Sequence, residues 1–226
     1  MRLASGRRIL PGWLGIFKTE LGGNASTVRH LYRWSDYDER DAARQQASDD
    51  AAFFGTVSRV ETTAGMTLPL PSLREHLSST HTMVMLEATS CLAACGLPGA
   101  DGFTPPPKAA PATAAPPVAY ELRTYQLQLG YSTVPKFLSL YQEGLADKLQ
   151  ADTSGASTLV TLLYSDCGPL NNVMELWRHE SLERSQASRV ASRAAPKWRA
   201  AIDQIAGLSV SFDTQFMRPL PCSPWR

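Results

Sequence analysis

The stretch STLVTLLYSDCGPLNNVMELWRH, residues 157–179, decides the fold of this chain. Its first part is rich in Leu, Val and Thr, its middle contains Gly168 and Pro169, and its last part is again mostly apolar. Two strand-forming runs that are separated by turn residues predict a β-hairpin. We therefore expect strands at 157–165 and 172–179, joined by a turn.

The segments around this hairpin predict a complete domain. Residues 120–129 have the composition of a strand, and a helix should follow, because its apolar residues fall on one face. After the hairpin come a helix at 181–195, a helical continuation beyond Pro196, and an alternating strand at 208–217. The order strand–helix–strand–strand–helix–strand predicts an α+β fold of the ferredoxin-like type. The apolar residues of the first helix are Val134, Phe137, Leu138, Tyr141, Leu145 and Leu149.

A repeat links this domain to the start of the chain. Adding 145 to residues 14–60 gives residues 159–205 without a gap, with apolar, aromatic, glycine and arginine positions in register. A repeat of this kind predicts one structural unit used twice. The matched pairs are Leu14 and Leu159, Gly23 and Gly168, Val28 and Val173, Leu31 and Leu176, Tyr32 and Trp177, Arg33 and Arg178, Ala42 and Ala187, Arg44 and Arg189, and Phe53 and Trp198.

The first copy is shorter than the second. It predicts a hairpin at 13–20 and 26–34, a broken helix at 36–60, a long polar loop and a last strand at 80–87. The first strand and first helix have no counterpart, although in the strand order 4-1-3-2 the first strand is central. Unpaired sheet edges are templates for another strand. We expect another polypeptide to supply the strand, the last strand to move in, or the natural chain to be longer at its N-terminus.

The segment GLPGADGFTPPPKAAPATAAPPV, residues 96–118, separates the two copies. Proline fixes φ and has no N–H to donate, so a stretch this rich in Pro and Ala predicts an extended, semi-rigid spacer. The predicted organisation is a truncated first domain at 1–95, a linker at 96–118 and a complete domain at 119–226.

Composition excludes several classes of function. The 226 residues include 22 basic and 21 acidic side chains, which gives no reason to expect a nucleic-acid partner. We expect no transmembrane segment, because no stretch reaches about 18–20 apolar residues, while peripheral membrane association stays open. The four cysteines lack metal-ligand spacing, so no metal is expected. The acid-poor, Arg- and Ser-bearing start is typical of a mitochondrial presequence, and a basic surface segment fits it equally.

Several short motifs resemble one known family, the NIPSNAP proteins. The resemblance covers residues 120–226 and 13–60. It rests on YELRTY at 120–125, GPLNNV at 168–173, LWR at 176–178, Arg184, Arg189 and Trp198 in the following helix, Arg218-Pro219, SPWR at 223–226, and LYRW at 31–34 in the first copy. The sequence departs from the family pattern at His179, where the family has Tyr, and at Tyr32, where it has Trp.

The resemblance implies a dimeric α/β barrel, in which two ferredoxin-like sheets face each other. It also implies a mitochondrial location, in the matrix or associated with the inner membrane, and an adaptor role without an agreed reaction. Related barrels include haem-binding proteins and cofactor-independent oxygenases that use the cavity between sheet and helices. The residues that could serve such a site here are Asn171, Trp177 and His179, with Arg178 beside them.

Strand alternation weighs against that site, because Trp177 and His179 share one face and Arg178 points to the other. Packing is the simpler role for Trp177 and His179. No cofactor is therefore expected, with haem as the alternative.

Four arginines recur between the copies: Arg33, Arg44, Arg178 and Arg189. The planar guanidinium suits pairing with a carboxylate, so these residues are predicted to pin each hairpin to its following helix, or else to bind an anion. We found no nucleotide-binding, hydrolase or metalloprotease motif. The sequence therefore predicts a non-enzymatic mitochondrial scaffold, an accessory subunit to which other protein subunits bind, possible donors of the missing strand among them. A haem- or small-molecule-binding barrel with oxygenase-type activity is the alternative.

Overall fold

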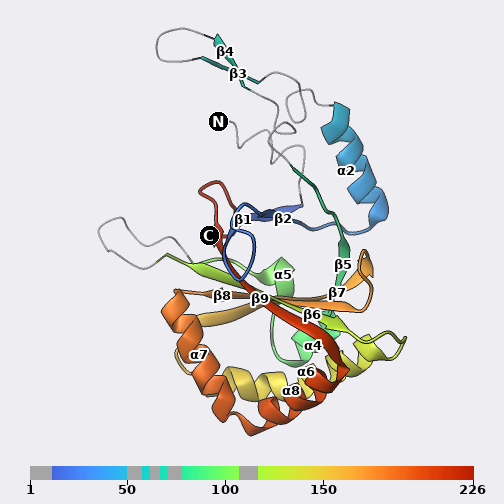
Figure 1. Ribbon diagram of the computed structural model, residues 1–226, viewed down its shortest axis with the longest axis vertical. Coiled ribbons are helices and arrows are strands. Elements are labelled where there is room, and N and C mark those ends of the chain that lie inside the picture. Colours follow the sequence, from blue (N-terminus) through green and yellow to red (C-terminus); the bar gives the residue numbers. More distant parts are fainter. Residues whose placement is uncertain (1–11, 50–57, 62–66, 71–77, 107–116) are drawn as a thin grey trace. The chain divides into compact units, whose positions relative to one another are not determined.

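The computed structural model describes residues 12–49, 58–61, 67–70, 78–106 and 117–226 (Figure 1). The chain divides into two compact units. The larger unit comprises residues 16–29 and 83–226, and the smaller comprises residues 1–15 and 30–82. The larger unit contains the predicted complete domain and the candidate site.

Four strands form the sheet of the complete domain: β6 (Ala119–Leu127), β7 (Ser157–Cys167), β8 (Asn172–His179) and β9 (Ser209–Pro219). They lie in the order β9-β6-β8-β7, and every neighbouring pair is antiparallel. In chain order this is 4-1-3-2, the ferredoxin-like arrangement. The predicted α+β class is confirmed at this level.

Three helices lie on one side of this sheet: α6 (Thr133–Ala151), α7 (Leu182–Ala194) and α8 (Pro196–Leu208) (Figure 1). The Ser181 side chain accepts a hydrogen bond from the backbone N–H of Arg184 and so caps the start of α7. Pro196 stands in the first turn of α8, where its missing N–H costs nothing. The chain can therefore end one helix and begin the next within two residues.

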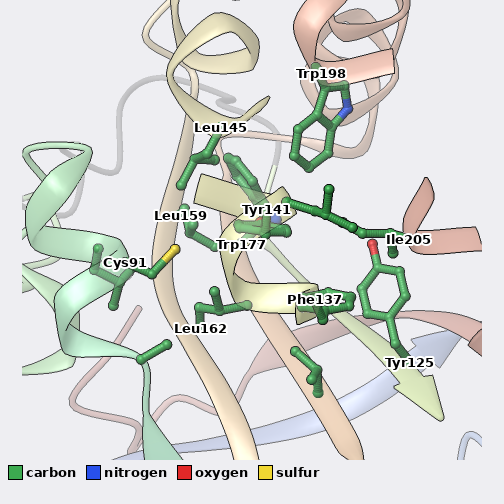
Figure 2. Packing of buried hydrophobic residues seen from close by; sticks show 14 of the residues in the cluster. Cys91, Tyr125, Phe137, Tyr141, Leu145, Leu159, Leu162, Trp177, Trp198 and Ile205 are labelled. Atoms are coloured by element: carbon green, nitrogen blue, oxygen red, sulfur yellow. The ribbon is translucent and has the colours of Figure 1, made fainter. Parts of the chain in front are cut away.

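The core fills the space between these helices and the sheet (Figure 2). Aromatic rings dominate it, because Phe137 and Tyr141 stack on successive turns of α6 and Trp198 meets Tyr141 edge-on. A short helix, α4 (Thr89–Ala94), adds Cys91 to the same core. Other members are Leu145, Leu159, Leu162, Trp177 and Ile205.

Strands from the first half of the chain pair with both edges of the four-stranded sheet. β1 (Trp13–Leu21) is antiparallel to β9, and β5 (Val84–Glu87) is antiparallel to β7. β2 (Val28–Tyr32) follows β1, so the full order is β2-β1-β9-β6-β8-β7-β5. β2 and β5 are the strands of the first copy that would flank its missing first strand. In this sheet each of them has a neighbour on one side.

The helix predicted over 36–60 is wrong in its last part. α2 (Tyr37–Asp49) is followed by β3 (Ser58–Glu61), which pairs with β4 (Thr67–Leu70) as an antiparallel hairpin. Strand pairing between neighbouring segments prevails over a helical apolar pattern, and the predicted polar loop therefore contains a strand. The predicted match of Phe53 with Trp198 lies outside the described residues. The last strand begins at Val84 rather than at residue 80.

The predicted spacer is not extended throughout, because residues Gly99–Gly102 form the short helix α5. The Glu87 carboxylate accepts the backbone N–H of Ala100 at 2.8 Å and the Thr161 hydroxyl at 2.6 Å. A Cβ at Gly99 would lie 2.8 Å from that carboxylate, and Gly99 has a φ of +67°. The positive φ favours glycine there, and the two hydrogen bonds to Glu87 tie the start of the spacer to β5 and β7.

Close packing of α6 on α8 predicts opposite effects for two glycine substitutions. A Cβ at Gly144 would lie 2.8 Å from the Ala201 Cβ and 3.1 Å from the Trp198 Cα, whereas one at Gly207 would meet nothing within 4 Å. We expect Gly144→Ala to lower the free energy of unfolding by about 1–2 kcal/mol, because overpacking outweighs the gain in helix propensity. Gly207→Ala, the matched control, should raise it by up to about 1 kcal/mol. Urea unfolding would measure both, and equal effects would contradict the packing.

Candidate functional site

A cluster of charged side chains lies buried between the sheet and the helices. At its centre is Glu121 on β6, whose side chain is fully buried. Its carboxylate accepts hydrogen bonds from Arg123 Nε at 2.8 Å, from Arg189 Nη2 at 2.5 Å and from His179 Nε2 at 3.0 Å. The Ser185 hydroxyl adds a fourth contact at 3.4 Å. One carboxylate thus joins β6, β8 and α7.

These contacts keep Glu121 ionised. Burial alone raises the pKa of a carboxyl group, but the hydrogen bond from His179 and the interactions with Arg123 and Arg189 outweigh it. The pKa of Glu121 therefore lies well below its usual range. A buried carboxylate is tolerated only where its oxygens are paired in this way.

A second buried carboxylate, Glu175 on β8, lies in the same cluster. It accepts hydrogen bonds from the Tyr125 hydroxyl and from the Trp177 indole N–H, each at 2.5 Å. Arg123 lies 4.0 Å from Glu175 and also binds Glu121, so it bridges the two carboxylates. Burial lowers the pKa of Arg123, but the charges of Glu175 and Glu121 raise it overall. Burial and the charge of Glu175 raise the pKa of Tyr125, which stays a hydrogen-bond donor.

His179 is held by both of its ring nitrogens. Nε2 lies 3.0 Å from the Glu121 carboxylate, and Nδ1 lies 2.8 Å from the Ser157 hydroxyl. Burial lowers the pKa of His179 despite the nearby carboxylate, so the ring is neutral at pH 7. Because an ionised carboxylate only accepts, we assign the proton to Nε2 and let Nδ1 accept from Ser157.

Lys148 on α6 is the unusual member of the cluster. Its ammonium nitrogen lies 3.8 Å from the centre of the Trp177 ring and 4.3 Å from that of Trp198. Among the residues that the structure describes, this nitrogen has no hydrogen-bond partner. Burial first, and then the charge of Arg123, lower the pKa of Lys148 to about 7, against the attraction of Glu175. The two indole rings stabilise the charged amine through cation–π interactions, but the loss of its hydration outweighs this stabilisation.

The charges of this cluster balance. Two carboxylates, Glu121 and Glu175, face two guanidinium groups, Arg123 and Arg189. A third cation has no counter-charge left, which adds to burial in lowering the pKa of Lys148. Each carboxylate already has its donors, so the arrangement suits a structural clamp better than a site that binds and releases a substrate.

Sequence comparison assigns this part of the chain. Residues 120–224 match the model of the NIPSNAP family. These residues thus form a NIPSNAP domain. The cluster, most of the core and the strand order 4-1-3-2 therefore lie in the NIPSNAP domain, and the resemblance inferred from the motifs is confirmed.

Known relatives are more distant over the whole chain. Human NipSnap homolog 3A is 24% identical over 212 residues, which cover 93% of this chain and 71% of the relative. A NIPSNAP family protein of unknown function from Agrobacterium tumefaciens is 27% identical, with a TM-score of 0.44, and covers 49% of this chain and 95% of its own. An uncharacterized NIPSNAP domain protein from Burkholderia xenovorans is 30% identical, with a TM-score of 0.40, and covers 46% and 95%.

The cofactor candidates of the NIPSNAP domain have other partners in the structure. Trp177 and His179 lie on the helix side of β8, in the cluster. Asn171 has a φ of +54° in the β7–β8 turn, and its side-chain amide donates to the carbonyl groups of Gln128 and Gly130. The Asn171 amide thus ties that turn to the end of β6.

The four predicted arginines have different surroundings. Arg189 binds Glu121, so α7 is tied to β6 and not to the acidic residues close to it in sequence. Arg178 lies on the opposite side of β8 and forms no ion pair among the described residues. In the smaller unit, Arg44 and Arg33 are exposed, and the charge of Arg44 partly offsets the rise in the pKa of Tyr32 that burial causes.

Sequence reasoning missed Glu121, Arg123 and Lys148. A signal for two of them is present, because Glu121 and Arg123 are charged residues at alternate positions of a strand that otherwise reads as buried. Such a pair indicates an ion pair on the covered face. Lys148 gave no comparable signal, since a lysine near the end of a helix is usually solvated.

Other features of the described residues add no reactive centre. An open depression of about 370 Å³ on α6 and α8 is lined by Glu143, Lys197, Ala200, Ala201 and Gln204, away from the cluster. The described residues contain no group of three potential metal ligands and no helix long and apolar enough to cross a membrane. The four cysteines are free thiols, and burial raises the pKa of Cys91 to about 11.

The shifted pKa of Lys148 predicts a pH-dependent stability. The folded pKa of about 7 lies below the ordinary value of 10.5, so between these pH values the unfolded chain binds a proton that the folded chain does not. Stability should therefore rise with pH across this window. We expect Lys148→Met to be more stable than wild type at pH 7, by about 1–4 kcal/mol, and the difference to shrink towards pH 10.

Denaturant unfolding of both proteins at pH 7, 8, 9 and 10 would measure this trend. Lys136→Met is the matched control, because Lys136 is exposed on the same helix. A difference between Lys148→Met and wild type that does not change with pH would show that Lys148 is charged throughout.

Proposed function

We propose that this protein is a non-enzymatic, mitochondrial NIPSNAP-type scaffold that acts as an accessory subunit of a larger protein assembly. In this proposal the sheet, rather than a pocket, is the functional surface. A partner strand pairs with an edge that the described residues leave open. The observation that carries the proposal is the order of the strands.

The strand order supports an incomplete barrel. A ring of eight strands would form if two sheets of order 4-1-3-2 met at both ends, with strand four of each sheet paired with strand two of the other. Here β9 pairs with β1 and β5 pairs with β7, which are the two joins of that kind. The seven strands occupy seven of the eight places, and the vacant place is that of the first strand of the first copy. α2 and α7 begin and end 145 residues apart, as the repeat requires.

The β5 edge has the properties of a strand acceptor. β5 is the last strand of the sheet order, and the backbone N–H of Ala88, just beyond it, donates to Leu162 on the β7 side. Since alternate residues of an antiparallel strand bond to opposite neighbours, the N–H groups of Met85 and Glu87 point away from β7. The exposed side chains of Met83 and Leu86 offer apolar contacts beside this edge. Edge strands of this kind recruit extended segments.

The geometry of the cluster argues against the oxygenase alternative. A haem or an oxygen substrate would need a histidine nitrogen or a base that is free to bind it. Both nitrogens of His179 are in hydrogen bonds, and Trp177 donates to Glu175. A ligand that bound His179 would therefore deprive the buried carboxylate of Glu121 of one of its hydrogen-bond donors. For the mitochondrial location we rely on the family resemblance, and this location is compatible with a scaffold role.

A proline at the β5 edge should abolish partner binding without unfolding the chain. In Met85→Pro the proline ring replaces an outward N–H, which an edge strand tolerates, but a second strand can no longer pair there. We expect tagged wild type to co-purify from mitochondria with a partner in fixed stoichiometry. Met85→Pro should lose that partner, and Met85→Ala, the matched control, should keep it.

Hydrogen exchange gives the second measurement. The amides of Met85 and Glu87 should exchange slowly in the complex and fast in the free chain. A wild-type protein that purifies only as a monomer, or a partner that Met85→Pro retains, would contradict the proposal. A Soret band that appears on adding haem and is lost in His179→Ala would instead favour the haem-binding alternative.

A further inference from the structure

The sheet of the larger unit has a second polar surface, on the face opposite α6, α7 and α8, which these three helices leave free (Figure 1). Thr19 lies opposite Met217, Met217 opposite Tyr120, and Tyr120 opposite Arg178. Directly opposed residues of antiparallel strands project to the same side. Because Glu121 and His179 project towards α7, their sequence neighbours Tyr120 and Arg178 project away from the helices.

The polar groups of this row are buried and unpaired. The exposed fractions are 2% for Thr19, 0% for Tyr120 and 7% for Arg178. Among the described residues, the Thr19 hydroxyl, the Tyr120 hydroxyl and the Arg178 Nε have no hydrogen-bond partner. Three unpaired polar groups on one face are costly, because each forfeits its hydrogen bonds to water. On the helix-covered face the Lys148 ammonium and the Tyr141 hydroxyl are also unpaired, but the carboxylates there have their donors.

The chemistry of the row selects the class of ligand. A guanidinium only donates, and the Tyr120 hydroxyl can donate as well. The charge of Arg178 and a polar side-chain contact with it partly offset the rise in the pKa of Tyr120 that burial causes, so the two groups lie close together. Neither group supplies the acceptor that the other group's N–H or O–H needs in a well-formed hydrogen bond. Neither group faces a carboxylate that would neutralise it. A compact oxyanion supplies both the missing acceptors and the missing charge.

The surroundings limit the size of the ligand. The Phe17 ring lies 4.7 Å from the Tyr120 ring, centre to centre, and Met217 and Leu122 are buried beside them. One more cation, Arg29, is near this face, where its Nη2 donates to Gln215 at 2.8 Å. Apolar walls around one available guanidinium suit a small molecule, and this depth of burial excludes the headgroup of a lipid that stays in a membrane.

We propose that Arg178 and Tyr120 form a binding site for a small oxyanion, a carboxylate or a phosphate group, on the helix-free face of the sheet. Thr19 stands in the same row and supplies a further hydroxyl. The site is independent of partner binding at the β5 edge, since it uses β1, β6, β8 and β9. It assigns to Arg178 a role that differs from that of Arg189, although both arginines recur in the repeat.

Thermal unfolding and titration calorimetry of the purified full chain would test the site, with sodium butyrate and inorganic phosphate as probes. Ionic strength is held constant with sodium chloride. We expect at least one probe to raise the Tm of wild type in a saturable manner, and comparison of the two probes identifies a carboxylate or a phosphate ligand. Arg178→Met should weaken binding by about 10- to 100-fold, the equivalent of one charge-assisted hydrogen bond.

Two further variants keep the test decisive. Tyr120→Phe removes only the hydroxyl, so it should fold even if Arg178→Met does not, and it should weaken binding by about 5- to 10-fold. Arg193→Met removes an exposed arginine of α7 and should bind as wild type does. The proposal is overturned if neither probe gives saturable stabilisation, or if Arg178→Met and Tyr120→Phe respond like wild type. Whether Met85→Pro loses its partner does not affect the outcome of the oxyanion titrations, because β5 is not part of the proposed site.

Discussion

The structure of the NIPSNAP domain depends on one buried carboxylate, that of Glu121. Its oxygens receive hydrogen bonds from β6 itself, from β8 and from α7, so it fixes the distance between the sheet and a helix that would otherwise be held by packing alone. A buried charge is costly unless its geometry is satisfied, and a misplaced helix would leave it unpaired. We infer that Glu121 and its donors select one arrangement of α7 on the sheet, at some expense of stability.

Lys148 follows from the same balance. Once Arg123 and Arg189 have neutralised Glu121 and Glu175, an additional positive charge has no partner, and the nearest groups are the rings of Trp177 and Trp198. A long aliphatic stem and a neutral amine then pack as part of the core. The carboxylates of the cluster thus have their donors without a ligand, and structural ion-pair networks of this kind also shift pKa values strongly.

Most of the fold could be predicted from local patterns, but the cluster could not. The strand at 172–179 and the helix after Ser181 have clear signals, namely a turn with Gly168 and Pro169 and an N-terminal cap. The partners of Arg189 and His179 lie on β6, some sixty residues away in sequence, so only the strand order brings them to Glu121. The helix predicted over 36–60 is wrong in its last part for a related reason. β3 forms because it pairs with β4, which lies outside the residues whose apolar pattern predicted the helix.

The two faces of β6 and β8 differ in a way that bears on function. On the helix side, each carboxylate of the cluster meets its donors. On the other side, Tyr120 and Arg178 are equally buried and lack acceptors among the described residues. The Lys148 ammonium and the Tyr141 hydroxyl also lack partners on the helix side, but among the described residues only the other face sets a guanidinium beside a hydroxyl without an acceptor. We infer that a ligand supplies the acceptor there. For this reason the helix-free face, together with the open edge at β5, is where binding is expected, while the conspicuous charged cluster holds the domain together.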